Sequence, residues 1–262
     1  MKIKAFLSFA KISMKMQVMY QPIFWSAFFG NIIWLIITYS FWLSAYESPN
    51  QFGISLNQMM TYSVLAMMLH RYMRGVGGIM SVIIRDGSIA VELMRPYHVM
   101  MKFFALDLGS KAIVFLRETT PMFLIIICFV PFQFASIQNT LFFLISALLG
   151  IYLGMIWDLI IDLFSFWLIN MWGVYLLYGS LVSLLSGAMI PLNFFPEWFS
   201  SIKDYLPFPS MIYVPTSIYT GELTGDLLYR ALYSQIGWIL GSMMVLMIFW
   251  NFAVKRLNVH GG

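Results

Sequence analysis

Residues 138–168 read QNTLFFLISALLGIYLGMIWDLIIDLFSFWL and contain only two charged side chains, Asp158 and Asp162. A helix needs about 20 mainly apolar residues to cross the hydrocarbon core of a bilayer, so this block is long enough to span one. Its apolar residues are continuous and do not alternate with polar ones, which favours a helix over a strand of a closed barrel. The block therefore predicts a membrane-spanning helix.

The rest of the chain has the same character. Of its 262 residues, 61% are hydrophobic and 10% are charged, whereas soluble domains are roughly half apolar. We therefore expect an all-α integral membrane protein that forms one transmembrane domain over residues 1–262, with room for six spans and no separate soluble domain. The expected spans are residues 23–45, 55–80, 108–130, 138–168, 172–190 and 230–252.

The sequence argues against several kinds of chemistry. Cys128 is the single cysteine, so no intramolecular disulfide forms, and the three scattered histidines do not have metal-ligand spacing. An intramembrane protease is disfavoured, because there is no G-x-S-x-G motif and Asp158 and Asp162 share one helix and do not face each other across two. No GxxxxGK[ST] loop occurs, and RGVGG at residues 74–78 lacks its lysine and its spacing.

The basic residues predict the orientation. With six spans both termini lie on one side of the membrane, and most of the 15 lysines and arginines are on that side, with only Lys203 and Arg230 opposite. Basic residues concentrate on the cytoplasmic side of membrane proteins, so we expect both termini in the cytoplasm. This distribution explains the net charge of +4 without a nucleic-acid partner.

Residues 1–21 precede the first span and predict an amphipathic helix in the membrane surface. At helical spacing one face carries Lys4, Ser8, Lys11 and Lys15, and the opposite face carries Phe6, Phe9, Ala10 and Met16. The alternative is a basic flank that only orients the first span. A cleaved signal peptide is disfavoured, because the following apolar block is too long and lacks an A-x-A site.

The charged stretch IIRDGSIAVELMRPYHVMMKFF, residues 83–104, is longer than a simple turn requires. Gly87 breaks the chain after Arg85 and Asp86, and residues 88–94 then predict two helical turns that end before Pro96. We expect Glu92 and Arg95 to project from this short helix. A small charged helix at the membrane surface suits docking of a cytoplasmic partner.

Residues 191–229 fall on the outer side in this layout. Five of the chain's ten prolines lie there and exclude one continuous helix, yet the segment is too aromatic for a free loop. Short broken helices that dip into the outer interface would satisfy both observations.

Two stretches resemble a known family. IIRDGSIAVELMRPYHV, residues 83–99, looks like the cytoplasmic loop of type-2 ABC transporter permeases, and LSGAMIPLNFFPEWFSSIKDYLPFPSMIYVPTSIYTGEL, residues 185–223, is similar to the connection between that family's fifth and sixth spans. Together with the six-span layout, the resemblance covers nearly the whole chain. The second motif comprises Gly187, Pro191, Phe195, Pro196, Trp198, Pro207, Phe208, Pro215 and Gly221.

The resemblance implies a permease of a bacterial-type plasma membrane, paired with itself or a related permease and joined to two ATP-binding subunits. Those partners would hold ATP and magnesium, so this chain would need no cofactor. The helix around Arg85, Asp86, Gly87, Glu92, Arg95 and Pro96 would be the coupling helix, supported by the N-terminal helix. The cargo would be a drug, peptide, lipid or glycan moved outwards. A secondary transporter or channel is the alternative.

Charges inside the expected spans need partners or water. From the predicted depths, Arg117 should pair with Asp158 and Lys111 should lie near Asp162. These would be structural ion pairs or, alternatively, part of a polar substrate path. The GIYLG stretch, with Gly150 and Gly154, permits close helix contact without identifying the partner. The 21 methionines could line an adaptable cavity or serve as apolar filler.

Overall fold

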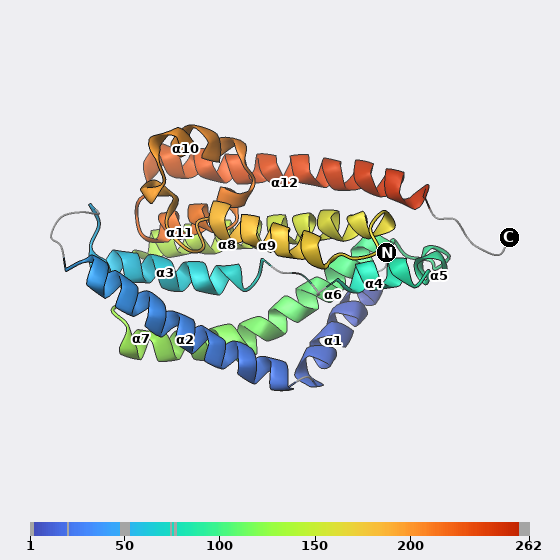
Figure 1. Cartoon of the computed structure of the whole chain (residues 1–262), viewed down its shortest axis with the longest axis horizontal. Helices are drawn as coiled ribbons and strands as arrows, with labels where there is room; N and C mark the ends of the chain where they lie inside the picture. The colour runs from blue at the N-terminus through green and yellow to red at the C-terminus, as the bar shows by residue number, and fades with distance from the viewer. Residues whose placement is uncertain (1–2, 20, 48–52, 74, 76–77, 257–262) are drawn as a thin grey trace.

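A computed structural model describes residues 3–19, 21–47, 53–73, 75 and 78–256. In these ranges the regular structure is helical, and no strand occurs. The longest helices run along the long axis of the molecule (Figure 1), and the helices pack around a shared apolar core. The prediction of an all-α fold is therefore confirmed.

Four helical stretches are long and apolar enough to cross a membrane. They lie within α2 (Gln21–Ala45), the continuous run of α6 (Val99–Val114), η1 (Phe115–Thr119) and α7 (Thr120–Phe129), α8 (Ile137–Leu163) with η2 (Phe164–Phe166), and α12 (Gly225–Val254). They correspond to the first, third, fourth and sixth expected spans.

The helix of the third expected span starts earlier than predicted, at Val99 and not at residue 108. The polar side chains in its first turns do not end the helix, because they form ion pairs. Lys102 pairs with Glu92, and Asp107 pairs with Lys111 one turn further along the same helix. A π-helical segment, η1, then interrupts the α-helix at the sequence FLRET.

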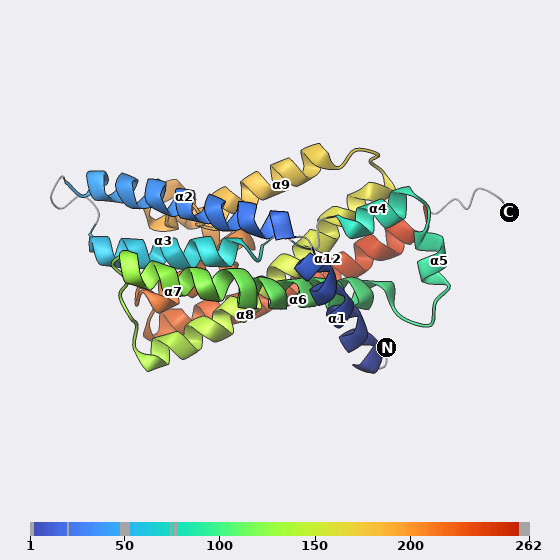
Figure 2. The same cartoon turned by 90° about the horizontal axis from the view of Figure 1, so that it is seen from below.

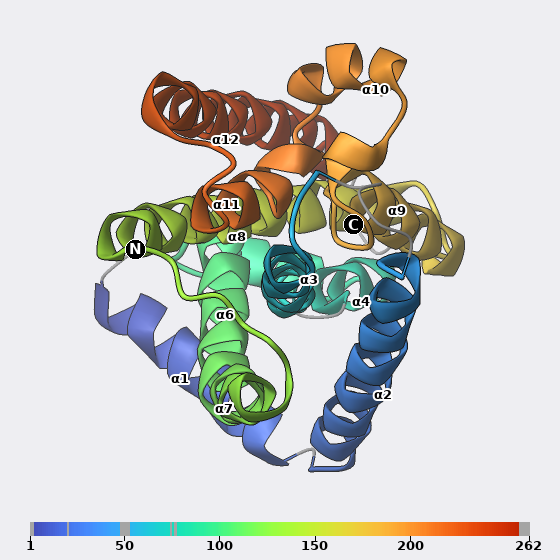
Figure 3. The same ribbon diagram turned by 90° about the vertical axis from the view of Figure 1, so that its left-hand side faces the viewer.

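The two remaining expected spans form shorter helices. α3 (Leu56–His70) has 15 residues and α9 (Trp172–Leu185) has 14, or roughly 22 and 21 Å at 1.5 Å per residue, less than a hydrocarbon core of about 30 Å. The expected span 55–80 is split, because a separate helix, α4 (Ile79–Arg85), follows α3. Figure 3 shows α3 surrounded by other helices, and most of its side chains are buried.

The N-terminal stretch forms α1 (Ile3–Met19), which confirms its predicted helical structure. Figure 2 shows α1 crossing α6 obliquely. The two backbones meet at Gly109, where an added Cβ would lie 2.1 Å from the carbonyl oxygen of Ala10. Phe6 and Phe9 pack against the core, as their predicted face requires, while Lys4 and Lys11 are exposed.

The GIYLG glycines make close contacts with connections between helices. A Cβ on Gly150 would lie 2.5 Å from the carbonyl oxygen of Met211, and one on Gly154 would lie 3.1 Å from the sulfur of Met73. Met211 leads into α11 (Tyr213–Tyr219) and Met73 follows α3. Because glycine has no side chain, α8 can pack directly against Met211 at Gly150 and against Met73 at Gly154.

The segment after α9 is a series of short helices that ends where α12 begins at Gly225, so the last long helix starts before residue 230. The series comprises η3 (Leu192–Phe194), α10 (Glu197–Ile202), η4 (Lys203–Tyr205), η5 (Phe208–Ser210) and α11. The prediction that prolines break this segment is confirmed, and α11 is buried throughout, Pro215 included. Gly187 has φ of 80°, which favours glycine, and its carbonyl accepts a hydrogen bond of 2.8 Å from Tyr62.

The other residues of this motif lie in or beside the short helices, and two of them make aromatic contacts. Pro191 is buried, Pro196 precedes α10, Pro207 precedes η5, and Gly221 follows α11. Phe195 stacks near Phe199 with ring centroids 4.8 Å apart, and Phe208 lies 5.6 Å from the Trp157 ring. Trp198 is 64% exposed, as an aromatic side chain at headgroup level would be.

Gln235, which the sequence analysis did not single out, joins α12 to α8 and η5. Its side chain is fully buried, donates to the carbonyl oxygens of Ser210 (2.7 Å) and Ser146 (3.2 Å), and accepts from the Ser146 hydroxyl at 2.8 Å. A single glutamine thus satisfies polar groups from two other elements.

We expect Gln235→Leu to lower the free energy of unfolding by about 1–3 kcal/mol, because buried groups lose their partners. The measurement is the thermal melting midpoint of the purified protein. Ser234→Leu, at the exposed neighbouring position, is the matched control. An equal effect of both substitutions would contradict this role of Gln235.

Candidate functional site: the α4–α5 loop and a buried acidic cavity

The charged loop folds as two short helices joined by a tight turn. α4 ends at Arg85, Gly87 adopts φ of 76°, and α5 spans Ile89–Leu93. The Ser88 N–H donates to Asp86 Oδ1 at 2.9 Å. The hydroxyl and N–H of Ser88 hold the pKa of the exposed Asp86 carboxyl below its usual value. The predicted break at Gly87 and the short helix after it are confirmed.

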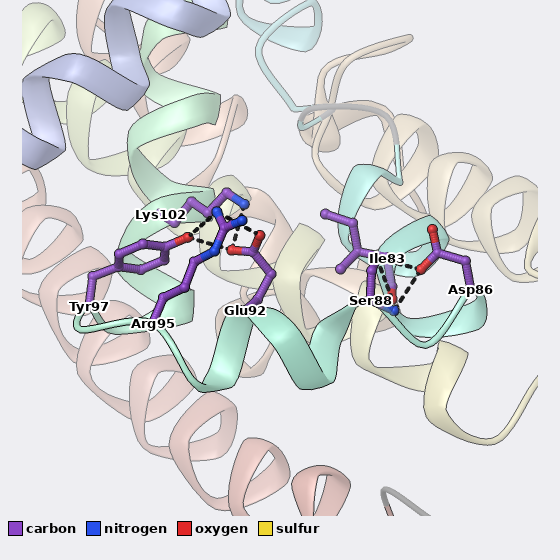
Figure 4. A network of polar contacts seen from close by, with 7 residues as sticks. All are labelled: Ile83, Asp86, Ser88, Glu92, Arg95, Tyr97 and Lys102. Atoms are coloured by element: carbon purple, nitrogen blue, oxygen red, sulfur yellow. Dashed lines mark hydrogen bonds and ion pairs between the residues drawn. The ribbon is translucent and has the colours of Figure 1, made fainter. Parts of the chain in front are cut away.

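A polar network fastens α5 to the start of α6. Figure 4 shows Lys102, Tyr97 and Arg95 converging on Glu92. Lys102 Nζ lies 2.7 Å from Glu92 Oε2, the Tyr97 hydroxyl donates to the same oxygen at 2.6 Å, and Arg95 Nη1 lies 3.3 Å from Oε1. Glu92 is only 8% exposed. Glu92 therefore projects from α5 towards Lys102 on α6 and not into solvent.

The network extends to α1. The Phe9 ring meets the Tyr97 ring edge-on with centroids 5.2 Å apart, and Lys102 Nζ lies 5.7 Å from the Phe9 centroid. These contacts connect α1, α5 and α6, with Glu92 at their centre.

The surroundings of Glu92 lower the pKa of its carboxyl group. Burial opposes its charged form, but the hydrogen bonds from Lys102 and Tyr97, with the charges of Lys102 and Arg95, outweigh burial and lower its pKa below the ordinary 4.5. Because the pKa is lowered, ionised Glu92 stabilises the folded state fully above pH 4.5. This contribution is lost as the pH falls through the lowered pKa.

We expect Glu92→Gln to reduce stability by about 1–3 kcal/mol at neutral pH, because it leaves the Lys102 ammonium group without its carboxylate. It should also flatten the stability profile below pH 4.5. Melting curves from acid to neutral pH measure both effects. Glu197→Gln, an exposed glutamate on α10, is the control. A Glu92→Gln protein as stable as the control at neutral pH would exclude a structural ion pair.

The surface that α5 leaves free is largely apolar. Met94 is 85% exposed and Val91 54%, and the Arg95 side chain is 51% exposed. Arg85 and Pro96 are also exposed. The charged residues of this stretch stand out in the sequence, whereas the exposure of Met94 and Val91 does not. The outer face of α5 thus combines an apolar contact area with a flanking arginine.

Arg117 contacts groups other than Asp158, and Lys111 pairs within its own helix. Arg117 Nη1 contacts the carbonyl oxygen of Val18 at 3.5 Å, and its guanidinium lies 5.0 Å from the Phe24 ring centroid. Lys111 Nζ pairs with Asp107 Oδ2 at 2.6 Å, whereas Asp162 accepts a hydrogen bond of 2.6 Å from Tyr175. Because the helix starts at Val99, residue 117 lies roughly 27 Å along it, too far for Asp158.

A different pair links α3 to η1. Arg71 Nε lies 2.9 Å from Glu118 Oε2, and the Tyr72 hydroxyl bonds the Thr119 hydroxyl beside it. No residue spacing indicates this pair, because its members lie on separate elements. It holds the end of α3 against the π-helical turn.

Asp158 and Asp162 line a cavity of about 350 Å³ that is partly open to the surface. Side chains of α3, α6, α8 and α9 contribute to its wall, and Gly75 and Gly78 lie at the approach to α4. Asp107 and His70 also line it. No group of three His, Cys, Asp or Glu residues in the described ranges has the geometry to hold a metal ion.

The four long apolar helices define the class of this protein as an integral membrane protein. Residues 14–261 match the model of the ABC-2 family transporter proteins, and the chain belongs to that family. It is therefore a permease, the membrane subunit of an ABC transporter, and this family works with an ABC ATPase. Comparison with curated proteins finds no match.

Proposed function

We propose that this chain is the export permease of an ATP-driven transporter and that the α4–α5 loop receives the motion of its ATPase. The observation that carries the proposal is an exposed apolar surface, Met94 and Val91, on a short helix held by the Glu92 network. A free surface can bind a partner, and a rigid attachment can transmit its movement to α6 and α1.

In this proposal the chain has six membrane crossings. α3 and α9 supply the two crossings beyond the four long helices, with the adjoining short helices completing the depth that each lacks. The α5 end faces the cytoplasm, as do both termini, in a bacterial-type inner membrane. The segment from α10 to α11 lies at the outer interface, where Trp198 meets the headgroups.

The complex contains two permeases, identical or related, and two ATPase subunits that hold ATP and magnesium. Closure of the ATPase dimer pushes on α5 and rocks the permeases between inward-facing and outward-facing states. The cargo is amphiphilic or hydrophobic and leaves the cytoplasm or the inner leaflet.

Gentle solubilisation of the tagged chain from its native membrane tests the proposal. We expect stoichiometric recovery of an ABC ATPase, with ATP hydrolysis that vanadate inhibits. A second permease in the same preparation would identify a heterodimer. A homogeneous chain without ATPase that moves solute down a gradient in liposomes would contradict the proposal and favour a channel or secondary carrier.

A further inference from the structure

The cavity between α3, α6, α8 and α9 has more carboxylates than cationic partners. Asp107, Asp158 and Asp162 line it, and the cation paired with them is Lys111, 2.6 Å from Asp107. Asp158 lies close enough to Lys111, Asp107 and Asp162 to interact electrostatically with each of them. Within the described ranges the site therefore gathers three carboxyl groups around one paired lysine inside the membrane domain.

Two of these carboxylates have an oxygen without a hydrogen-bond partner. Among the described residues, neither Asp107 Oδ1 nor Asp158 Oδ2 has one, although both atoms are buried. The Tyr178 hydroxyl, which is also buried without a hydrogen bond, lies beside Asp158. Asp107 is only 6% exposed. Buried carboxylate oxygens are normally satisfied, since leaving one bare costs free energy. A bound cation would place a positive charge next to both oxygens.

The remainder of the wall suits an organic cation better than an inorganic ion. The rings of Phe103, Phe104 and Trp172 line the same cavity, and aromatic faces attract organic cations. Its volume, about 350 Å³, is large for a bare ion and within the range of small-molecule pockets. The described carboxylates also lack the geometry of a metal site.

The cavity is also placed to communicate with the coupling loop. Trp172 is 72% exposed, so the cavity reaches the surface at the start of α9. On the other wall a Cβ at Gly75 would lie 2.9 Å from Asp158 Oδ2, and one at Gly78 would lie 2.9 Å from the Tyr175 hydroxyl. Gly78 immediately precedes α4. The chain that leads into the loop therefore lies directly against the acidic groups.

We propose that this cavity binds a lipophilic organic cation, with Asp158 and Asp107 facing its positive charge and the aromatic rings around its apolar body. The inference rests on the proposed function, because it names the class of cargo that the permease carries. The entry of α4 would sense the occupant directly.

Two ions of the same shape and opposite charge test the proposal. Full-length protein in lipid nanodiscs is titrated with radiolabelled tetraphenylphosphonium or tetraphenylborate, and binding to empty nanodiscs is subtracted. We expect saturable binding of the cation alone. Asp158→Asn should weaken it at least about tenfold, whereas Asp226→Asn, at an exposed position on α12, should not change it.

Protection from chemical labelling covers the case in which Asp158→Asn does not fold. Dicyclohexylcarbodiimide modifies buried carboxyl groups, and peptide mass spectrometry locates the product. In the unmodified sequence, tetraphenylphosphonium should slow labelling of Asp158 and tetraphenylborate should not. Equal binding of both ions, cation binding that survives Asp158→Asn, lack of protection, or competition by millimolar magnesium would each overturn the proposal.

These experiments do not require the ATPase, so the two proposals can fail separately. Cation binding to a chain that recovers no ATPase would refute the export function and leave the binding site. A complex with an active ATPase whose permease does not bind the cation would refute the cargo class alone.

Discussion

Met94→Asp is expected to abolish recovery of the ATPase with the tagged permease while the permease itself still folds. Met94 is the most exposed apolar side chain of the α4–α5 loop, at 85%, and its removal leaves the Glu92 network intact. A hot-spot side chain at the centre of an interface is worth about 2 kcal/mol or more, or roughly thirtyfold in affinity, and a buried carboxylate adds a desolvation cost. Quantitative recovery of both chains after affinity purification measures the effect.

Met189→Asp is the matched control. Met189 is 62% exposed and lies between α9 and η3, in the part of the chain proposed to face outwards. Its substitution adds the same charge and should leave ATPase recovery unchanged. If Met94→Asp retains the ATPase, or if both variants lose it equally, α5 is not the docking element.

Gly109→Val is expected to have the largest effect on folding. The added Cβ would lie 2.1 Å from the carbonyl oxygen of Ala10, and two helix backbones leave no flexible side chain to move aside. α1 must then separate from α6, at a cost of about 1–3 kcal/mol or more. Because Phe9 contacts both Tyr97 and Lys102, vanadate-sensitive ATP hydrolysis by the complex should decline as well.

Gly241→Val controls for the change of residue type. Gly241 lies in the long helix α12, and a Cβ there would meet no atom within 4 Å. Both variants have the same loss of backbone freedom and the same β-branched side chain. Melting midpoints of the two proteins should differ by several degrees. Equal midpoints would show that α1 is not held by its contact with α6.

The fold class could be predicted from the sequence because it follows from properties that neighbouring residues share. Long apolar blocks, prolines and the glycine at residue 87 act locally, so the all-α class, the breaks between residues 191 and 224 and the short helix after Gly87 were predictable. The N-terminal helix was predictable for the same reason, since its amphipathic faces repeat at helical spacing.

The polar partners could not be predicted in the same way. Glu92 meets Lys102 and Arg71 meets Glu118 because separate elements bring these groups together. The depth of Arg117 was misjudged because the start of its helix was placed at residue 108. The helix begins at Val99 and continues through polar residues that are paired. The cavity could not be predicted for the same reason, because its walls come from four separate helices, α3, α6, α8 and α9.

Site-specific photo-crosslinking tests the central claim, that α5 is the contact point for the ATPase, most directly. A benzophenone amino acid replaces Met94 in one sample and Trp198 in another. Trp198 is also well exposed, at 64%, but lies on α10, far from α5 (Figure 1). Irradiation of native membranes should join the ATPase to position 94 and not to position 198. Crosslinking of the ATPase at position 198, or its absence at position 94 when the two proteins copurify, would contradict the account.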